Sequence, residues 1–290
     1  MGCASNASRA VGGLREPERE ASSSNPSSRR LRKHIVSNWL QRLNPRPDAA
    51  QRLFCFHHAG GSAAAFRLWP QRLPEFDVCA VQLPGRANRF VEAPLDHVEP
   101  LLDALVPVML PLLDRPYALF GHSMGSAVAA GVAHRLHAVG APLPRRLFVS
   151  GRQAPQRQFP EWSMSGLSDA EALASVQRSF GGFAPEALAN PELLEMMMPT
   201  LRADFALLES FPRTPAAPLA VSVVAVGGAE DEFASPQRMQ TWQSLTTAPL
   251  VRHALPGGHF YLDSSLDALL ALVRAECGVA ETAETLRGAA

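Results

Sequence analysis

The sequence has no excess of either charge and no long apolar run. Its 290 residues carry 27 Lys and Arg against 27 Asp and Glu, so the formal net charge is zero. A chain without net charge lacks the long-range field that concentrates nucleic acid or an anionic membrane at a protein surface. No apolar stretch approaches the ~20 residues of a membrane-spanning helix. We therefore expect no nucleic-acid partner and no membrane association.

Cysteine is also scarce, with four residues at positions 3, 55, 79 and 277. These residues are too few and too widely spaced for a disulfide framework or a zinc site, so we expect no metal and no cofactor. Cys55 and Cys79 lie inside apolar runs, which favours buried thiols. The absence of both a disulfide framework and an apolar N-terminal signal core favours a cytoplasmic protein. We also expect the protein to be a monomer.

The N-terminal part of the chain differs in composition from the rest. Residues 1–38 are rich in Ser, Arg, Asn and Pro and contain few large apolar side chains. Such a segment buries too little surface to offset the entropy lost on ordering, so we expect an extension without stable structure. Trp39 and Leu40 mark the expected first contact with a folded domain at 39–280. Residues 281–290 are expected to form a flexible tail.

Short apolar runs alternate with helical patterns over the rest of the chain. Near-continuous apolar runs that end at glycine suit strands covered on both faces, and alternation with helices indicates a mostly parallel sheet. The sequence therefore predicts an α/β fold with a doubly wound sheet, whose ligands bind at the carboxyl ends of the strands. The predicted strands cover 53–56, 76–81, 117–120, 146–150, 219–226 and 250–255, and the helices 101–113, 124–139, 236–246 and 263–276.

The interval between the fourth and fifth predicted strands is too long for a single crossover. Ser168 and Glu171 have the spacing of a capping box, and Pro191 opens a second helical pattern that extends to Phe211. We expect residues 151–215 to form a helical lid over the carboxyl edge of the sheet. The consecutive methionines at 196–198 line either an adaptable acyl-binding surface or an ordinary helix core.

The strongest chemical signal is Gly121-His122-Ser123-Met124-Gly125. It lies between a predicted strand and a predicted helix, which is the context of a nucleophile elbow. Glycines two residues either side of the serine allow neighbouring backbone to approach without a clashing Cβ. The unpaired amides at the helix N-terminus favour developing negative charge. These features predict that Ser123 is a catalytic nucleophile.

A serine nucleophile needs a base, and on this scaffold the chain order is nucleophile, acid, histidine. His259 follows the last predicted strand in a glycine-rich loop, whereas His253 lies inside that strand. We therefore predict His259 as the base. The acid should follow the fifth strand, where Glu230, Asp231 and Glu232 are adjacent. We choose Asp231, because a shorter side chain fixes the imidazole more firmly, while a shift of one residue remains the alternative.

An oxyanion hole requires two backbone donors aimed at one point. The amide of Met124, directly after the nucleophile, supplies one. The loop after the first predicted strand, His57-His58-Ala59-Gly60-Gly61-Ser62, supplies the second, and Ala59 is the candidate. The paired histidines of this loop have no matching cluster of ligands elsewhere, so we do not expect a metal site there.

Five segments together resemble a known family. They are 54–62, Gln82-Leu83-Pro84-Gly85-Arg86, the 121–125 elbow, Leu201-Arg202-Ala203-Asp204-Phe205 and Gly257-Gly258-His259-Phe260. In order and spacing they resemble the type II thioesterases of polyketide and nonribosomal peptide biosynthesis, which have the α/β-hydrolase fold. The resemblance spans roughly residues 39–275. It departs from the family at His57, where proline is usual, and at Glu232, where proline often follows the acid.

By this resemblance, Ser123, Asp231 and His259 form the catalytic triad and Ala59 and Met124 the oxyanion hole. The implied activity is hydrolysis of acyl thioesters on the phosphopantetheine arm of an acyl or peptidyl carrier protein, which edits or releases chains. The alternatives are a small-molecule carboxylesterase or lipase, an acyltransferase using the same triad, and a catalytically silent protein that binds carrier proteins.

Overall fold

The computed structural model describes Met1 and residues 37–155, 163–183, 188–214 and 216–279. By its internal contacts the chain divides into Met1–Ile35 and Val36–Ala290, and every element named below lies in the second unit. The predicted unstructured extension and the 281–290 tail fall almost entirely outside the described residues. Leu40 is buried in the core and Trp39 packs against the same cluster, while the predicted domain boundary at residue 39 stays a prediction.

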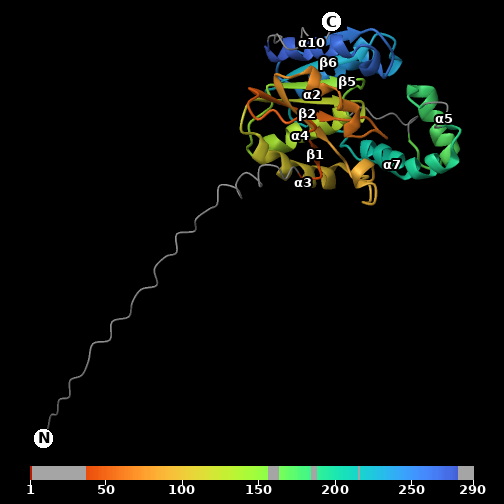
Figure 1. Ribbon diagram of the computed structural model, residues 1–290, viewed down its shortest axis with the longest axis horizontal. Helices are drawn as coiled ribbons and strands as arrows, with labels where there is room; N and C mark the ends of the chain where they lie inside the picture. The colour runs from red at the N-terminus through yellow and green to blue at the C-terminus, as the bar shows by residue number, and fades with distance from the viewer. Residues whose placement is uncertain (2–36, 156–162, 184–187, 215, 280–290) are drawn as a thin grey trace. The chain divides into compact units, whose positions relative to one another are not determined.

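A seven-stranded sheet forms the centre of the described unit (Figure 1). The strand order is β1-β3-β2-β4-β5-β6-β7, with β1 antiparallel to β3 and all other neighbours parallel. The predicted mostly parallel sheet is therefore confirmed, and β1 is a short addition that the sequence analysis missed. The strands are β1 (Leu40–Gln41), β2 (Gln51–Phe56), β3 (Phe76–Val81), β4 (Tyr117–His122), β5 (Arg146–Ser150), β6 (Ser222–Gly228) and β7 (Val251–Leu255).

Two strands differ from their predicted form. β6 begins three residues later than predicted, because Leu219 makes only an isolated bridge to Thr246. β7 lies at the edge of the sheet, and its residues alternate between half-buried and exposed. His253 on this strand is half-buried and lies 3.1 Å from Glu276, so it does not point into a packed face. The prediction that the strands are buried on both faces therefore holds for the central strands but not for β7.

Helices cover both faces of the sheet. α3 (Val98–Met109) and α4 (Met124–Ala138) contribute to one large apolar cluster. α2 (Trp69–Arg72), α9 (Tyr261–Ser264) and α10 (Leu266–Cys277) contribute to a second. α3 and α10 lie on opposite sides of the strands in Figure 1. Cys55 and Cys79 are both buried, as predicted. No helix of the described ranges is both long enough and apolar enough to span a bilayer.

Three predicted helices are divided. The stretch 101–113 consists of the end of α3 (Val98–Met109) followed by a 3₁₀ helix, Leu110–Leu112. The stretch 236–246 consists of the single turn α8 (Pro236–Met239) followed by a 3₁₀ helix, Gln240–Leu245. The stretch 263–276 is interrupted at Ser265, whose φ of −120° is not helical and whose hydroxyl donates to the carbonyl of Pro256. These are tertiary and side-chain effects that helical periodicity does not reveal.

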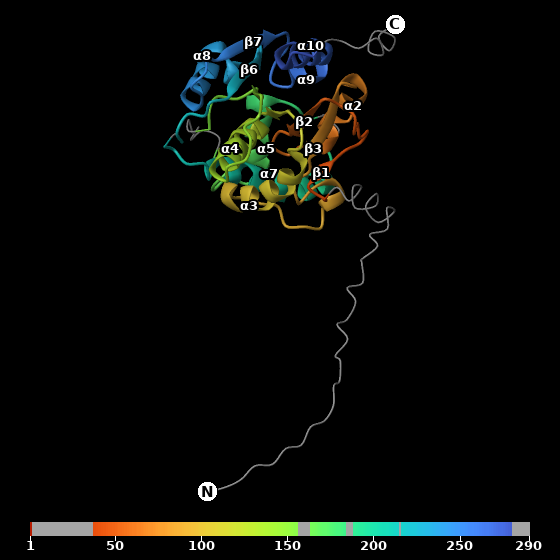
Figure 2. The same cartoon turned by 90° about the vertical axis from the view of Figure 1, so that its left-hand side faces the viewer.

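Within the described residues, two helices lie between β5 and β6. They pack on each other and are neighbours in both views (Figures 1 and 2), and Figure 1 shows them beside the sheet. α5 (Asp169–Phe180) begins with the predicted capping box of Ser168 and Glu171. α7 (Pro191–Glu209) begins at Pro191, with Asn190 as its N-cap. Together they bury an apolar cluster of their own, so they form a helical lid with a separate small core. The lid residues at 156–162, 184–187 and 215 lie outside the described residues.

The methionines of α7 do not form an acyl-binding surface. Met198 is buried in the lid core, whereas Met196 is exposed. Neither contributes to the cavity beside Ser123. The helix-core interpretation therefore holds for Met198, whereas the exposed Met196 fits neither interpretation.

The strand order reverses between β2 and β4, since β3 lies beyond β2 and β5 lies beyond β4. Loops that leave the two central strands therefore turn away from each other and leave a crevice at the carboxyl edge. The loop after β2 carries Ala59, and the turn after β4 carries Ser123. The topology alone thus brings the predicted nucleophile and the predicted oxyanion loop to the same place.

The start of α4 is packed against β2 with no room for a side chain. A Cβ added at Gly125 would lie 2.0 Å from the carbonyl oxygen of Phe56, and one added at Gly121 would lie 2.1 Å from the carbonyl oxygen of Gly125. Both contacts are with backbone, which cannot swing aside. The glycines of the elbow are therefore required by close backbone approach.

We predict that Gly125→Ala destabilises the protein by about 3 kcal/mol or more, because overpacking against backbone forces the helix away from the strand. The matched control is Gly131→Ala on the same helix, where an added Cβ would be no nearer than 3.4 Å to its neighbours. That variant should gain up to about 1 kcal/mol from helix propensity. Urea unfolding of both variants measures the difference, and equal effects would contradict the prediction.

Candidate active site

Ser123 occupies a strained backbone conformation between β4 and α4. Its φ of 53° and ψ of −116° lie in a region that residues with a side chain rarely adopt. Two contacts with β5 hold this turn: the Ser123 amide donates to the Ser150 carbonyl at 2.7 Å, and the Ser126 hydroxyl accepts from the Ser150 amide at 2.9 Å. Strain of this kind persists only where the surroundings enforce it. The elbow geometry that the motif predicts is present.

His259 and Asp231 come from the loops after β7 and β6 and are joined by a hydrogen bond. His259 Nδ1 lies 2.8 Å from Asp231 Oδ2, and both side chains are almost completely buried. The other oxygen of Asp231 accepts the amides of Phe233 at 2.9 Å and Ala234 at 3.2 Å, which fixes the carboxylate. The neighbouring Glu230 and Glu232 are exposed. The structure therefore pairs His259 with Asp231, the residue chosen from the three adjacent carboxylates.

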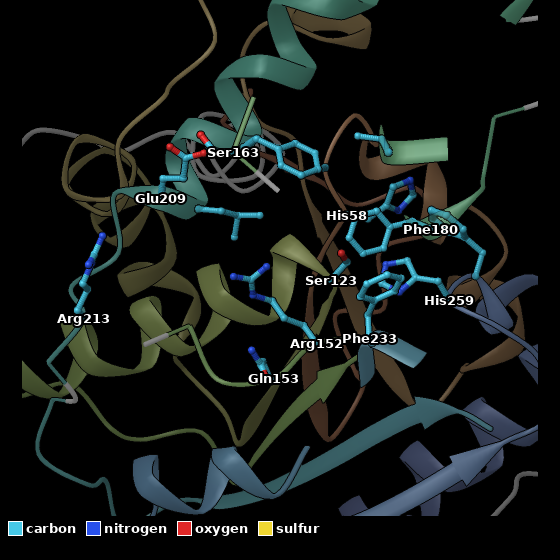
Figure 3. A pocket seen from close by; sticks show the side chains of 16 residues that line it. His58, Ser123, Arg152, Gln153, Ser163, Phe180, Glu209, Arg213, Phe233 and His259 are labelled. Atoms are coloured by element: carbon cyan, nitrogen blue, oxygen red, sulfur yellow. The ribbon is translucent and has the colours of Figure 1, made fainter. Parts of the chain in front are cut away.

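Ser123 and His259 line one cavity of about 310 Å³ (Figure 3). The hydroxyl of Ser123 points into this cavity, with the His259 ring beside it. Phe180 of the lid packs on the His259 ring with 4.8 Å between ring centroids. The lid thus supplies part of the wall, and the remaining apolar lining includes Val176, Phe205, Leu208, Phe233 and Phe260.

The loop after β2 places Ala59 at the same cavity. Within the part of the chain that the structure describes, the Ala59 amide makes no turn or loop hydrogen bond with the backbone. Gly60, the next residue, has a φ of +73°, a left-handed conformation that glycine adopts without a steric penalty. Its amide is instead bonded to Asp204 of α7 at 2.7 Å. Ala59 lines this cavity and Met124 directly follows Ser123, which also lines it. An oxyanion hole requires two backbone amides aimed at one point, and these two remain the predicted donors.

Two histidines that the sequence analysis did not assign to the site lie near His259: His122 contacts its ring, and His58 contacts the rings of His122 and Phe260. The His122 ring is 5.1 Å from that of His259 between centroids, and its Nδ1 contacts the Ser150 hydroxyl at 2.9 Å. Burial, and then the positive charge of His259, hold the pKa of His122 well below its usual value. Burial lowers the pKa of His58 to about 4, with the charges of His259 and Arg86 acting in the same direction. Both rings are therefore neutral at pH 7.

Sequence signals for these two residues existed. His122 is the second residue of the elbow motif, and His58 directly precedes Ala59 in the oxyanion loop. Motif position alone, however, does not reveal that His122 packs on the His259 ring or that His58 packs on His122.

Arg152 is a further residue that the sequence analysis missed. It follows β5 at the carboxyl edge, is 7 % exposed and lines the cavity. Its Nε has no hydrogen-bond partner within the described ranges. Burial lowers the pKa of Arg152 to about 10, so its guanidinium remains charged at neutral pH. In Figure 3 it lies on the side of Ser123 opposite to His259, and it gives this end of the cavity a positive hydrogen-bond donor.

Comparison with known proteins agrees with this geometry. The family model of the Thioesterase domain matches residues 51–277. Linear gramicidin dehydrogenase LgrE of Brevibacillus parabrevis is 38% identical over 241 residues, which cover 82% of this chain and 91% of that protein. The RedJ thioesterase of the prodiginine pathway in Streptomyces coelicolor is 40% identical with a TM-score of 0.73, covering 81% and 94% of the two chains. The type II thioesterase BorB of the borrelidin cluster is 34% identical with a TM-score of 0.74, covering 83% and 98%.

The name of LgrE refers to a dehydrogenase, but this chain contains no Gly-x-Gly pair of the kind that opens a dinucleotide-binding fingerprint. The family match and the two solved structures are thioesterases, and the elbow around Ser123 agrees with them. The chain belongs to the thioesterase family, has the α/β-hydrolase fold, and resembles type II thioesterases of biosynthetic pathways along most of its length.

Proposed function

We propose that this protein is a serine thioesterase that hydrolyses acyl thioesters on the phosphopantetheine arm of an acyl or peptidyl carrier protein. The observation that carries the proposal is the arrangement at one cavity. Ser123 sits on a strained elbow, beside His259, whose ring is held by the buried carboxylate of Asp231. The similarity to RedJ and BorB supports the thioester as substrate and a biosynthetic pathway as context.

In the proposed acylation step, His259 Nε2 takes the proton of the Ser123 hydroxyl. Asp231 bonds to Nδ1, which fixes the tautomer and stabilises the imidazolium that forms. Ser123 Oγ attacks the thioester carbonyl carbon, and the resulting oxyanion accepts the amides of Ala59 and Met124. The carbon–sulfur bond then breaks, and the departing thiolate takes the proton from His259 and leaves as the pantetheine thiol, which returns His259 to its neutral form. Because a thiol has a pKa near ~8.5, it departs more easily than an alkoxide or an amine.

In the proposed deacylation step, water replaces the thiol. His259 takes a proton from the water, the hydroxide adds to the acyl-enzyme carbonyl, and Ser123 leaves with the proton returned by His259. The neutral His58 and His122 suit this cycle, because a second positive ring beside His259 would oppose its protonation. The products are the free acid and the carrier protein with a free thiol.

Two other activities would use the same residues, and assays distinguish them from thioester hydrolysis. A carboxylesterase or lipase would turn over a p-nitrophenyl ester better than an acyl-pantetheine thioester of equal chain length. An acyltransferase would release transferred acyl product instead of free acid. A protein without catalytic activity that binds carrier proteins would fail to react with a fluorophosphonate at Ser123. We expect preference for the thioester, free acid as product, and labelling of Ser123.

Removal of the Ser123 hydroxyl tests the proposed nucleophile. Ser123→Ala should abolish thioester hydrolysis and fluorophosphonate labelling, because no other hydroxyl takes its place at the elbow. Urea unfolding should change by less than about 1 kcal/mol, since the loss of one small hydroxyl has a modest effect on stability. Residual hydrolysis at more than about 1 % of the wild-type rate would contradict the assignment of Ser123.

Replacement of Asp231 by its amide tests the proposed acid. Asp231→Asn should lower kcat by roughly 10³–10⁴-fold, because the amide favours the wrong imidazole tautomer, while fluorophosphonate labelling stays detectable. Glu230→Gln is the matched control, since that side chain is exposed and precedes Asp231 by one residue. The control should keep the wild-type rate. The reverse pattern would show that the adjacent glutamate is the acid.

A further inference from the structure

The lid contributes a completely buried carboxylate to the loop that bears Ala59. Asp204 lies in α7 and has no exposed surface. Its Oδ2 accepts the amide of Gly60 at 2.7 Å. This bond joins the lid to the residue that directly follows the candidate oxyanion donor. A shift of the Gly60 peptide would rotate the preceding peptide as well, because the two share a backbone.

Arg86 completes this contact from a third segment. Its two terminal nitrogens each lie 2.7 Å from an oxygen of Asp204, which makes a bidentate ion pair. Arg86 also donates to the carbonyl of Gly61 at 3.1 Å and to that of Pro84 at 3.2 Å. The loop after β2, the loop after β3 and the lid helix therefore meet at one carboxylate.

Stability alone does not account well for such a pair. Removing two charges from water costs several kcal/mol per ion, and apolar replacements of buried ion pairs are often neutral or stabilising. What the pair supplies is direction, since bidentate charge-assisted hydrogen bonds fix their groups in orientation as well as distance. The groups fixed here are the peptides on the C-terminal side of Ala59.

We propose that Asp204 is a positioning residue of the oxyanion hole: it holds the Gly60 peptide so that the Ala59 amide faces the cavity. Because Asp204 belongs to α7, the second oxyanion donor is in place only when the lid helix is docked. This inference rests on the role proposed above for Ala59. It makes the lid part of the machinery that stabilises the transition state, in addition to being a wall of the cavity.

The same helix provides an internal comparison. The Thr200 hydroxyl, one turn before Asp204, donates to the carbonyl of Gly85 at 2.7 Å. This bond also ties the lid to the body but does not touch the oxyanion loop. Asp77 provides a second comparison, because it is an equally buried carboxylate paired with Arg42 and Arg52 at the amino end of β3.

The test compares a ligand that fills the oxyanion hole with one that does not. A trifluoromethyl ketone thioether of pantetheine accepts Ser123 Oγ at its carbonyl carbon, so that a hemiketal oxyanion forms and the serine proton moves to His259. The corresponding thioether with a methylene in place of the ketone binds the cavity without an oxyanion. We expect Asp204→Asn to weaken the ketone roughly 30- to 100-fold and to change the affinity of the methylene analogue less than twofold.

The rate of hydrolysis should change in parallel with the affinity for the ketone. For Asp204→Asn we expect kcat on acyl-pantetheine to fall by a similar factor and KM to stay within about twofold. Thr200→Val should leave both inhibitor affinities and kcat unchanged. Asp77→Asn should lower the midpoint of thermal unfolding yet keep the affinity ratio of the two inhibitors. If Asp204→Asn weakens both inhibitors equally, or either control changes the ratio, the inference is overturned.

A further variant covers the case in which Asp204→Asn does not fold. Arg86→Gln keeps a neutral donor toward Asp204 and should reduce ketone affinity in the same direction by a smaller factor. An unchanged ketone affinity in that variant would overturn the inference. Failure of the proposed function gives a different result. The wild-type protein would then not hydrolyse acyl-pantetheine, but it would still bind the ketone through Ser123, and this binding would depend on Asp204. That result would refute the thioesterase proposal and support the positioning role.

Discussion

The close approach of the elbow to strand β2 is the constraint on which the rest of the site depends. Gly125 lies against the Phe56 carbonyl at a distance that excludes even a methyl group. This contact brings the start of α4 beside the loop that leaves β2. Ser123 and Ala59, which lie far apart in the chain, thereby line one cavity. A sheet whose strand order reverses between β2 and β4 is what makes the approach possible.

Sequence reasoning succeeded where the signal is local. The central strands, the capping box of α5 and the elbow are each determined by neighbours within a few residues, so apolar runs and glycine spacing predicted them. It failed where distant segments decide the outcome. Ser265 interrupts a helical pattern because its hydroxyl reaches Pro256. Arg152 and His122 join the site because β4, β5 and β7 end at one edge, and Asp204 was noticed as part of a motif without any indication of its partner. Periodicity contains no information about such contacts.

The surroundings of His259 follow from the same packing. His122, Phe180 and Phe260 stand around its ring with centroids about 5 Å away. Burial keeps His122 and His58 neutral, so two polar rings pack there without adding charge. Arg152 places a charge at the opposite end of the cavity. The cavity is therefore uneven, with aromatic rings around His259 at one end and charged side chains, Arg152, Arg213 and Glu209, at the other.

The two fully buried aspartates show how position in the sheet decides what an ion pair does. Asp77 and Asp204 each accept hydrogen bonds from an arginine in a forked geometry, which a lysine would not reproduce. Asp77 lies at the amino end of β3, where it joins β3 to Arg42 and to Arg52 of β2, and no cavity residue is among these partners. Asp204 reaches the loops at the carboxyl end, where ligands bind. A pair of the same chemistry thus holds the sheet together at one edge, while at the other it holds the Gly60 peptide, next to the amide that we propose as an oxyanion donor.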